Sequence, residues 1–226
     1  MRLVMLGVLA IALAQEKNEA EELFRKMEEK FTNAKSFQLS WKGAAKVKEG
    51  DITAEGTIVL DEGNKVRIDV YAKVIEMEQK DQFVSDGKTL KTFGSRPSTT
   101  DTPGTFNKTV LGSLARGGAI YALTVINMKY YSKETDPAKL FTLTSFAMGK
   151  REEVDKREAQ IIEFKATLGP AHQEAQVKLW IDRETGLPVK RVFTVNEMNQ
   201  DIVNTETYSN FKFDEKIDPK KFEFPK

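Results

Sequence analysis

The spacing of hydrophobic positions changes along this chain, from a helical period near the N-terminus to strict alternation after it. Within residues 16–37, Glu and Lys occupy one face of the repeat. The other face has apolar side chains at three- and four-residue steps: Ala20, Leu23, Phe24, Met27, Phe31 and Ala34. This spacing predicts one amphipathic helix whose apolar stripe packs against a sheet.

From Phe37 onward, apolar residues occupy every second position, which is typical of antiparallel strands with one buried and one wet face. The alternation runs through residues 37–47, 52–60 and 66–70, and turn compositions separate these segments at Gly50-Asp51 and at 61–64. We therefore expect a set of paired strands in the first third of the chain.

The stretch DQFVSDGKTLKTF, residues 81–93, predicts a hairpin corner, because Asp86-Gly87 can supply the positive φ of a tight two-residue turn. Residues 94–104 are small and polar and contain Pro97 and Pro103, so they predict a loop.

The next segment is apolar and alternates poorly. A short helix through Val110, Leu111 and Leu114 is expected to end at Gly117-Gly118. From Ile120 to Tyr131 the pattern fits a second short helix or a strand, and we favour the helix. From residue 140 the period of two returns in five segments separated by turn residues, which predicts a meander of about five strands.

The first residues differ from the rest. Arg2 precedes an apolar run that ends in Ala12-Leu13-Ala14, which is too short to span a bilayer, since a spanning helix needs about 20 apolar residues. The order of basic, apolar and small residues predicts a secretory signal, residues 1–14, although a buried or membrane-lying amphipathic start is the alternative. No repeat or linker divides the remainder, so we expect a single domain, 15–226.

The net charge and the lack of cysteine exclude several classes of function. The chain has 35 Lys and Arg against 34 Asp and Glu, and loss of Arg2 with the signal would leave equal numbers, so no global field attracts nucleic acid or an anionic membrane. The absence of cysteine excludes disulfides, thiol catalysis, thiolate metal sites and a lipidated cysteine. We therefore expect an exported, soluble, unanchored protein, in a bacterial periplasm.

Catalytic patterns are scarce. The single histidine, His172, lies in a predicted turn, and no cysteine or second histidine can complete a dyad or a metal set with it. No Gly-rich phosphate loop, Gly-x-Ser-x-Gly or His-Glu-x-x-His sequence occurs. We expect no enzyme activity, no metal and no cofactor. A large apolar sheet face with few helices to cover it can instead enclose a ligand cavity or pack as a dry core.

The order of these elements and two motifs resemble the periplasmic lipoprotein-carrier superfamily, which includes LolA, LolB and the RseB-type sensors. A helix, AKSFQLSWKG, paired strands, FVSDGKTLKTF, a Pro-rich loop, an apolar helical insertion and a meander ending in DPKKFEF follow one another over nearly all of the mature chain. VSDGKTL is close to the family's own turn. LWIDRETGLPVKR, Leu179 to Arg191, resembles a Trp-x-Asp-x-x-Thr-Gly-x-Pro hairpin found in wider members.

The resemblance implies a mainly β (α+β) fold, with a strongly curved antiparallel sheet that forms an unclosed β-barrel of about 10–11 strands. An N-terminal helix and short inserted helices would lid it. The lipid-binding cavity would be lined by Leu39, Trp41, Ile68, Val70, Phe83, Leu90, Phe193 and Val195. The lid would contain Val110, Leu111, Leu114 and Ile120.

The function implied by the resemblance is that of a soluble, monomeric periplasmic carrier for outer-membrane lipoprotein sorting. Its ligand would be a lipoprotein acyl chain or a lipid, and its partners an inner-membrane release complex and an outer-membrane receptor. The alternative is an RseB-like envelope sensor that recognises a partner protein.

The turn at residues 61–64 departs from the pattern of the family, and Trp180 departs from the alternation of apolar and polar residues along its strand. Carrier members have a basic residue and a proline before the third strand, and that arginine helps to latch the lid, whereas residues 61–64 here read Asp-Glu-Gly-Asn. Arg67 alternates with Val66 and Ile68, so it is expected to face outward. Trp180 falls on the polar side of its strand, so we expect either a bulge or a convex-face Trp that packs under a loop or meets a partner.

Overall fold

The computed structural model describes residues 18–47, 50–127, 136–168, 173–197 and 200–225. Its strands form one antiparallel sheet in the order β6-β5-β4-β3-β2-β1-β11-β10-β9-β8-β7. They are β1 (Phe37–Val47), β2 (Gly50–Asp61), β3 (Lys65–Val74), β4 (Met77–Asp86), β5 (Thr89–Phe93), β6 (Ser98–Asp101), β7 (Phe141–Val154), β8 (Arg157–Leu168), β9 (Gln173–Asp182), β10 (Pro188–Glu197) and β11 (Gln200–Phe213). The helices are α1 (Glu19–Thr32), α2 (Phe106–Asn127), α3 (Pro137–Leu140) and the 3₁₀ helix η2 (Pro219–Phe222).

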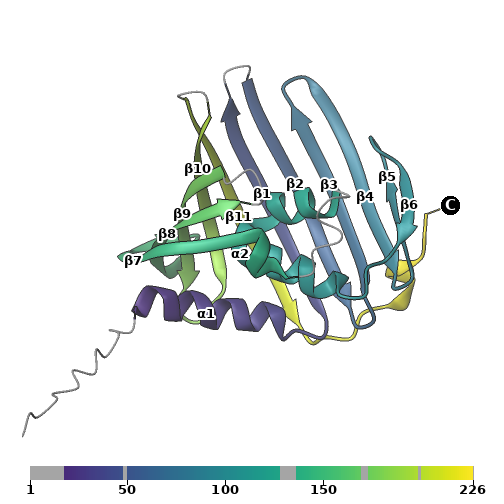
Figure 1. The fold of residues 1–226 in the computed structure, drawn as a ribbon, viewed down its shortest axis with the longest axis horizontal. Coiled ribbons are helices and arrows are strands. Elements are labelled where there is room, and N and C mark those ends of the chain that lie inside the picture. The colour runs from purple at the N-terminus through teal and green to yellow at the C-terminus, as the bar shows by residue number, and fades with distance from the viewer. Residues whose placement is uncertain (1–17, 48–49, 128–135, 169–172, 198–199, 226) are drawn as a thin grey trace, which may run out of the picture.

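The sheet consists of two meanders, β1–β6 and β7–β11, joined where β1 pairs with β11. It curves strongly around α2, which crosses its concave face, while α1 runs along one end (Figure 1). Strands β6 and β7 are the two edges and do not pair with each other, so the barrel is unclosed. The predicted fold class is therefore confirmed, including the five-strand meander after residue 140.

Cross-strand register assigns each residue to one face. Leu39, Ile58, Ile68 and Phe83 are successive partners from β1 to β4, and all four are buried in the main core, which defines the concave face. Alternate positions along a strand have opposite parity and face opposite sides of the sheet. Positions whose parity is opposite to that of these four residues therefore face the convex side. Arg67 has this parity and forms an ion pair with Asp69, so its predicted outward orientation is correct.

Helix α1 begins at Asn18, whose side chain accepts hydrogen bonds from the backbone N–H groups of Ala20 and Glu21. Such a cap satisfies donors that have no partner within the helix. The predicted stripe is buried through Ala20, Phe24, Met27 and Phe31. Phe31 and Phe37 meet in an aromatic cluster at this end of the sheet.

Helix α2 is kinked rather than split. Gly118 has φ 81° and ψ −176°, a backbone conformation that favours glycine, and a second helical half follows directly. The predicted end at Gly117-Gly118 thus becomes a kink, and the favoured second helix is present up to Asn127; residues 128–131 of that prediction lie outside the described residues. Within the described chain, α2 is long and apolar enough to cross a membrane, but its apolar window is 67% buried, as in a core helix.

The loop predicted for residues 94–104 contains a strand. Ser98–Asp101 pairs with β5 as β6, and all four of its residues are exposed. The small and polar composition predicted a loop here because this short edge strand lies between the two prolines and has no buried face. At the C-terminus, η2 buries Phe222 against Val59 on the convex face.

Trp180 lies on the convex face, as its parity indicated, and is buried there rather than exposed. It packs with Ala159, Ile161 and Val189, and its Nε1 donates a hydrogen bond to Glu152 of β7 at 2.9 Å. The ammonium groups of Lys178 and Lys190 lie over its ring, 5.0 Å and 4.7 Å from the centre, so these neighbouring side chains account for its burial.

Candidate functional site

The predicted cavity residues gather on the concave face. Seven of the eight are at most 7% exposed and belong to one apolar cluster: Leu39, Trp41, Ile68, Phe83, Leu90, Phe193 and Val195. Val70 is half-buried against the same cluster. Their shared position follows from their parity, but in most of this region α1 and α2 fill the concave face.

The predicted lid residues divide at the kink of α2. Val110, Leu111 and Leu114, in the first half, are at most 3% exposed and form part of the core. Ile120, in the second half, is only half-buried. Beneath the first half, next to Leu39, Leu114 and Tyr208, the remaining space is too small to hold a water molecule, and it leaves the first half of α2 close-packed. This half of α2 is therefore packed as core.

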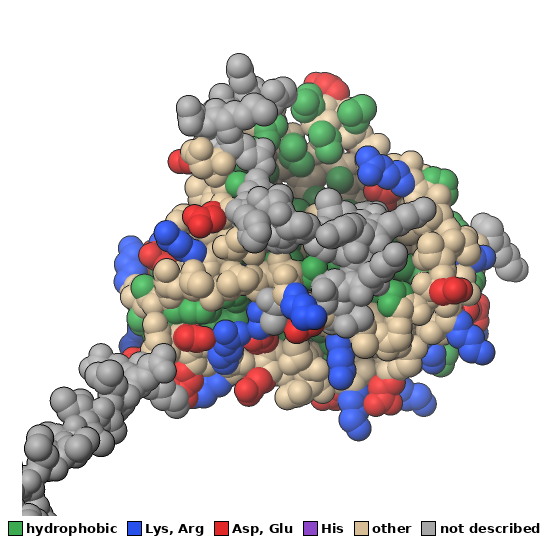
Figure 2. Space-filling model, viewed as in Figure 1, with side chains coloured by type: hydrophobic (Ala, Val, Ile, Leu, Met, Phe, Trp, Pro, Cys, Tyr) green, Lys and Arg blue, Asp and Glu red, His purple; other side chains and the backbone are tan. Residues whose placement is uncertain are grey.

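Above α2 the concave face is less completely covered. We call this region the upper hollow and define it by half-buried or exposed apolar side chains of one parity on β1–β4 and β11, together with two from α2. They are Ala45, Ile52, Ala54, Val70, Ala72, Val74, Met77, Ile202, Ile120 and Leu123. Figure 2 shows a recess lined by hydrophobic side chains at this end of the sheet. The upper hollow adjoins the core through Ala54, Val70, Ile120 and Leu123, and Gln79 and Asp81 of β4 share its parity.

Two buried polar atoms lie on the concave face near the base of the upper hollow. Nε1 of Trp41 and Oδ1 of Asn204 have no hydrogen-bond partner among the described residues. Asn204 is the register partner of Ala45, one of the hollow residues. Such buried, unpaired groups cost stability and are uncommon in native structures, so each can pair with a ligand group.

Two fully buried charges hold α2 at its kink. Arg191 and Glu206 are register partners on β10 and β11 and are both 0% exposed. Arg191 Nη2 donates to the carbonyl of Ala115 at 2.6 Å and Nη1 to that of Leu114 at 3.3 Å. The cation thus binds the C-terminal end of the first half-helix, where the partial charge is negative.

Glu206 binds the other side of the kink. Its carboxylate oxygens accept from the backbone N–H groups of Ala119 at 2.9 Å and Ile120 at 3.0 Å, and from the Tyr208 hydroxyl. The anion lies at the N-terminus of the second half-helix, where the partial charge is positive. A Cβ at Gly118 would overlap the same carboxylate, so this contact needs glycine.

Burial raises the pKa of Tyr208 well above its ordinary value, and the neighbouring Glu206 charge raises it further, while Arg191 lowers it. The phenol therefore remains a proton donor to Glu206 at physiological pH.

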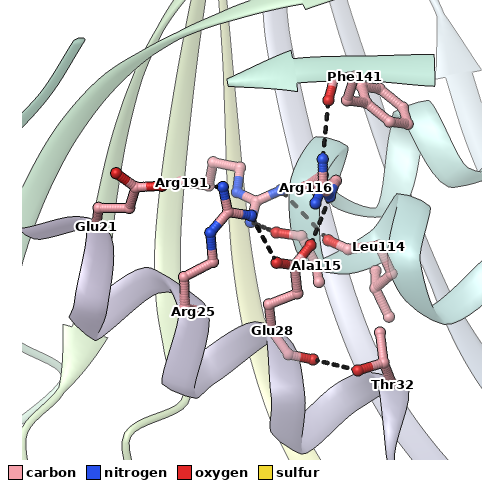
Figure 3. A network of polar contacts seen from close by, with 9 residues as sticks. All are labelled: Glu21, Arg25, Glu28, Thr32, Leu114, Ala115, Arg116, Phe141 and Arg191. Atoms are coloured by element: carbon pink, nitrogen blue, oxygen red, sulfur yellow. Dashed lines mark hydrogen bonds and ion pairs between the residues drawn. The ribbon is translucent and has the colours of Figure 1, made fainter. Parts of the chain in front are cut away.

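The first half of α2 has further anchors. Figure 3 shows Arg116 between α1 and β7, donating to Glu28 and to the carbonyl of Phe141, the latter at 3.0 Å. At its start, Asn107 Nδ2 donates to the carbonyl of Asp61 at 2.6 Å. The turn at residues 61–64, which lacks the family's arginine and proline, thus holds α2 by other contacts.

Neither Arg191 nor Glu206 was predicted as a site residue from the sequence. Arg191 has the parity of Phe193 and Val195, which were assigned to the concave face, and Glu206 has the parity of Tyr208. Two features of the sequence could have indicated them: charged residues at inward positions of otherwise apolar strands, and the glycine pair Gly117-Gly118. His172 lies outside the described residues. Within the described ranges, no three His, Cys, Asp or Glu side chains form a group that could hold a metal ion.

The chain matches the model of a known protein family. A family model described as a predicted periplasmic protein, DUF2092, matches residues 20–226. No curated protein matches the chain. A similar solved structure is LprF from Mycobacterium bovis, with 14% identity, 85% of this chain and 92% of LprF covered, and a TM-score of 0.49.

Two further solved structures are similar to the chain. The complex of MucA and MucB from Pseudomonas aeruginosa gives 14% identity, with 92% of this chain and 61% of the matched chain covered and a TM-score of 0.45. A LolA superfamily protein from Nitrosomonas europaea gives 12% identity, 91% and 97% coverage, and a TM-score of 0.37. The superfamily predicted from the motifs is thus among the matches, and at these identities the likeness concerns the fold alone.

Proposed function

Because this chain belongs to the DUF2092 family of predicted periplasmic proteins, we propose that it is a periplasmic carrier that shelters acyl chains in its upper hollow without covalent chemistry. The cargo is a lipoprotein or a lipid, carried by a soluble monomer in outer-membrane lipoprotein sorting. An inner-membrane release complex would load it and an outer-membrane receptor would unload it.

The apolar upper hollow is the observation that supports this proposal. Four of its side chains, Ala54, Val70, Ile120 and Leu123, pack against the core, and those on the sheet leave apolar surface in contact with solvent. Burying each methylene of a hydrocarbon chain there gains about 0.8 kcal/mol. A chain of ordinary length can therefore bind without a strong polar contact.

The unpaired polar atoms fit the same ligand. An acyl chain carries an ester or amide carbonyl at one end, and Trp41 Nε1 is a donor without a partner among the described residues. A carbonyl placed against it would remove the cost of a buried, unsatisfied N–H. The chain would then lie along the hollow toward Ile52 and Met77.

Filling the upper hollow tests this function. Ala54 is half-buried on the concave face, and Ala44 is exposed on the convex face of the neighbouring strand. We expect Ala54→Trp to weaken binding of a fluorescent fatty-acid analogue at least tenfold, while Ala44→Trp leaves it unchanged. The readout is a fluorescence titration of detergent-free protein, with thermal unfolding to show that both variants fold. Equal affinity in both variants, or no binding by the wild type, would overturn the proposal.

The second candidate, an envelope sensor that recognises a partner protein, is favoured by the open sheet. The edge strands β6 and β7 each have one side without a strand partner among the described residues, and such edges can accept an added strand. This function predicts that an envelope protein co-purifies equally with wild type and Ala54→Trp. Loss of that protein from the filled variant would favour the carrier instead.

A further inference from the structure

A second pocket lies on the convex face of the sheet, away from the upper hollow. Its volume is about 540 Å³. This is within the range of about 300–1,000 Å³ that is usual for small-molecule sites. We call it the outer groove and define it by Lys42, Glu55, Asp69, Tyr71, Gln82 and Phe93.

The register places the outer groove on the convex face. Thr57, Asp69, Gln82 and Phe93 are successive partners from β2 to β5, in the row next to the buried concave partners Ile58, Ile68 and Phe83. Glu55, Tyr71 and Lys80 form the next row of the same parity. Backbone between the two rows, including that of Gly56, forms the floor.

The C-terminal segment borders this surface. It covers the adjacent convex row, where Val59 is buried with Ile217 and Phe222. Arg67, in that row, donates to the carbonyl of Lys221 at 3.3 Å. The outer groove therefore begins where the covering segment ends.

Charges in the outer groove are balanced. Asp69 accepts from Arg67 at 2.9 Å and from the side-chain amide of Gln82. Lys42 and Glu55 form an ion pair at 3.4 Å. These pairings leave no concentrated field of one sign, so the site favours a ligand without net charge over a phosphate or a carboxylate.

Two half-buried aromatic rings complete the lining. Phe93 and Tyr71 come from β5 and β3, and Lys80 lies over the Tyr71 ring with Nζ 5.8 Å from its centre. The neighbouring Glu78 raises the pKa of Tyr71 through a side-chain hydrogen bond. Aromatic faces bind apolar C–H surfaces, while the amide and carboxylate groups beside them bind hydroxyls.

A peptide strand is a poorer occupant. The floor of the outer groove is the interior of a paired sheet, so its N–H and C=O groups already serve the β1–β2, β2–β3 and β3–β4 ladders. Strand addition needs a free edge, which the floor does not offer.

We propose that the outer groove is a binding site for a neutral sugar unit, whose apolar ring face stacks on Phe93 and Tyr71 while its hydroxyls pair with Gln82 and Asp69. The site is distinct from the upper hollow, and it does not depend on the proposed carrier function.

The test is a titration of the ¹⁵N-labelled full chain with cellobiose, maltose and diacetylchitobiose, followed by amide chemical shifts. We expect at least one sugar to give saturable shifts at the backbone of residues 55–57, 69–71 and 80–93. Phe93→Ala should weaken this binding at least fivefold, and Phe93→Tyr, which keeps the ring, should retain it.

Gln82→Ala provides a second variant should Phe93→Ala fail to fold, and it is expected to weaken the same binding. Absence of saturable shifts with all three sugars at millimolar concentration would overturn the proposal. Saturable shifts that centre on the upper hollow, or that persist unchanged in both Phe93→Ala and Gln82→Ala, would also overturn it.

Discussion

Arg191 and Glu206 face each other across β10 and β11, and each lies against a half-helix end of opposite partial charge. Burying a lone charge costs several kcal/mol, but here every contact with α2 is a charge-assisted hydrogen bond. The residues fix where α2 crosses the sheet, and this position separates the filled core from the upper hollow.

Replacement of Arg191 by Met is expected to destabilise the protein by about 3 kcal/mol, because the carbonyls of Leu114 and Ala115 lose their donor and Glu206 keeps its buried charge. Urea unfolding measures the change. The matched control is Arg183→Met, since Arg183 is exposed and its ion pair with Glu158 is worth at most about 1 kcal/mol. Equal effects of the two substitutions would contradict the assigned role.

Tyr208 predicts a dependence on high pH. Its pKa is raised in the folded state by burial first and by Glu206 second, whereas an unfolded tyrosine ionises near pH ~10. The unfolded chain therefore releases this proton at lower pH, so the contribution is complete below about pH 10 and is lost as the pH rises further. We expect the free energy of unfolding to fall more steeply above that pH in the wild type than in Tyr208→Phe. Identical slopes would show that Tyr208 titrates normally.

Helix α2 is the element that separates the filled core from the upper hollow. Its apolar residues and its paired glycines predicted two short helices, and the structure has two half-helices. The sequence could not show that they remain one kinked element, because the conformation of Gly118 is stabilised by Glu206, which is 88 positions away in the sequence. Local pattern contains no information about such a contact.

Substitution of Gly118 by Ala should destabilise the protein by about 2–3 kcal/mol, since φ is 81° and the new Cβ would overlap the Glu206 carboxylate. Gly104→Ala is the control, because a Cβ there meets nothing within 4 Å. Thermal unfolding of both variants compares them. A Gly118→Ala protein as stable as Gly104→Ala would mean that the kink is not held by Glu206.

At the scale of the whole molecule, alternation predicted the sheet well because parity alone assigns a face. It placed Leu39, Ile68 and Phe193 on the concave side and Trp180 on the other. Parity could not show that Glu152 of β7 accepts a hydrogen bond from Trp180, because β7 has register shifts against β8 and a positive φ at Ser145. The composition rule missed β6 because an exposed four-residue edge has no apolar signature.

The candidate site was predictable only in part, because parity assigns a residue to a face but does not show whether the residue is covered. Buried Leu39 and half-buried Val70 have equal parity, so the sequence could not show where the core ends and the upper hollow begins. The packing of α2 sets that boundary. Because the two regions adjoin, the sheet is both the scaffold of the core and the wall of the proposed lipid site.

Native mass spectrometry of the protein, purified from its own envelope fraction without detergent, tests the carrier function most directly. We predict an added mass in the wild type that collisional activation releases as a lipid or a lipopeptide, and its loss in Ala54→Trp but not in Ala44→Trp. A wild type that carries no such mass, or an Ala54→Trp protein that carries it to the same extent, would contradict the account.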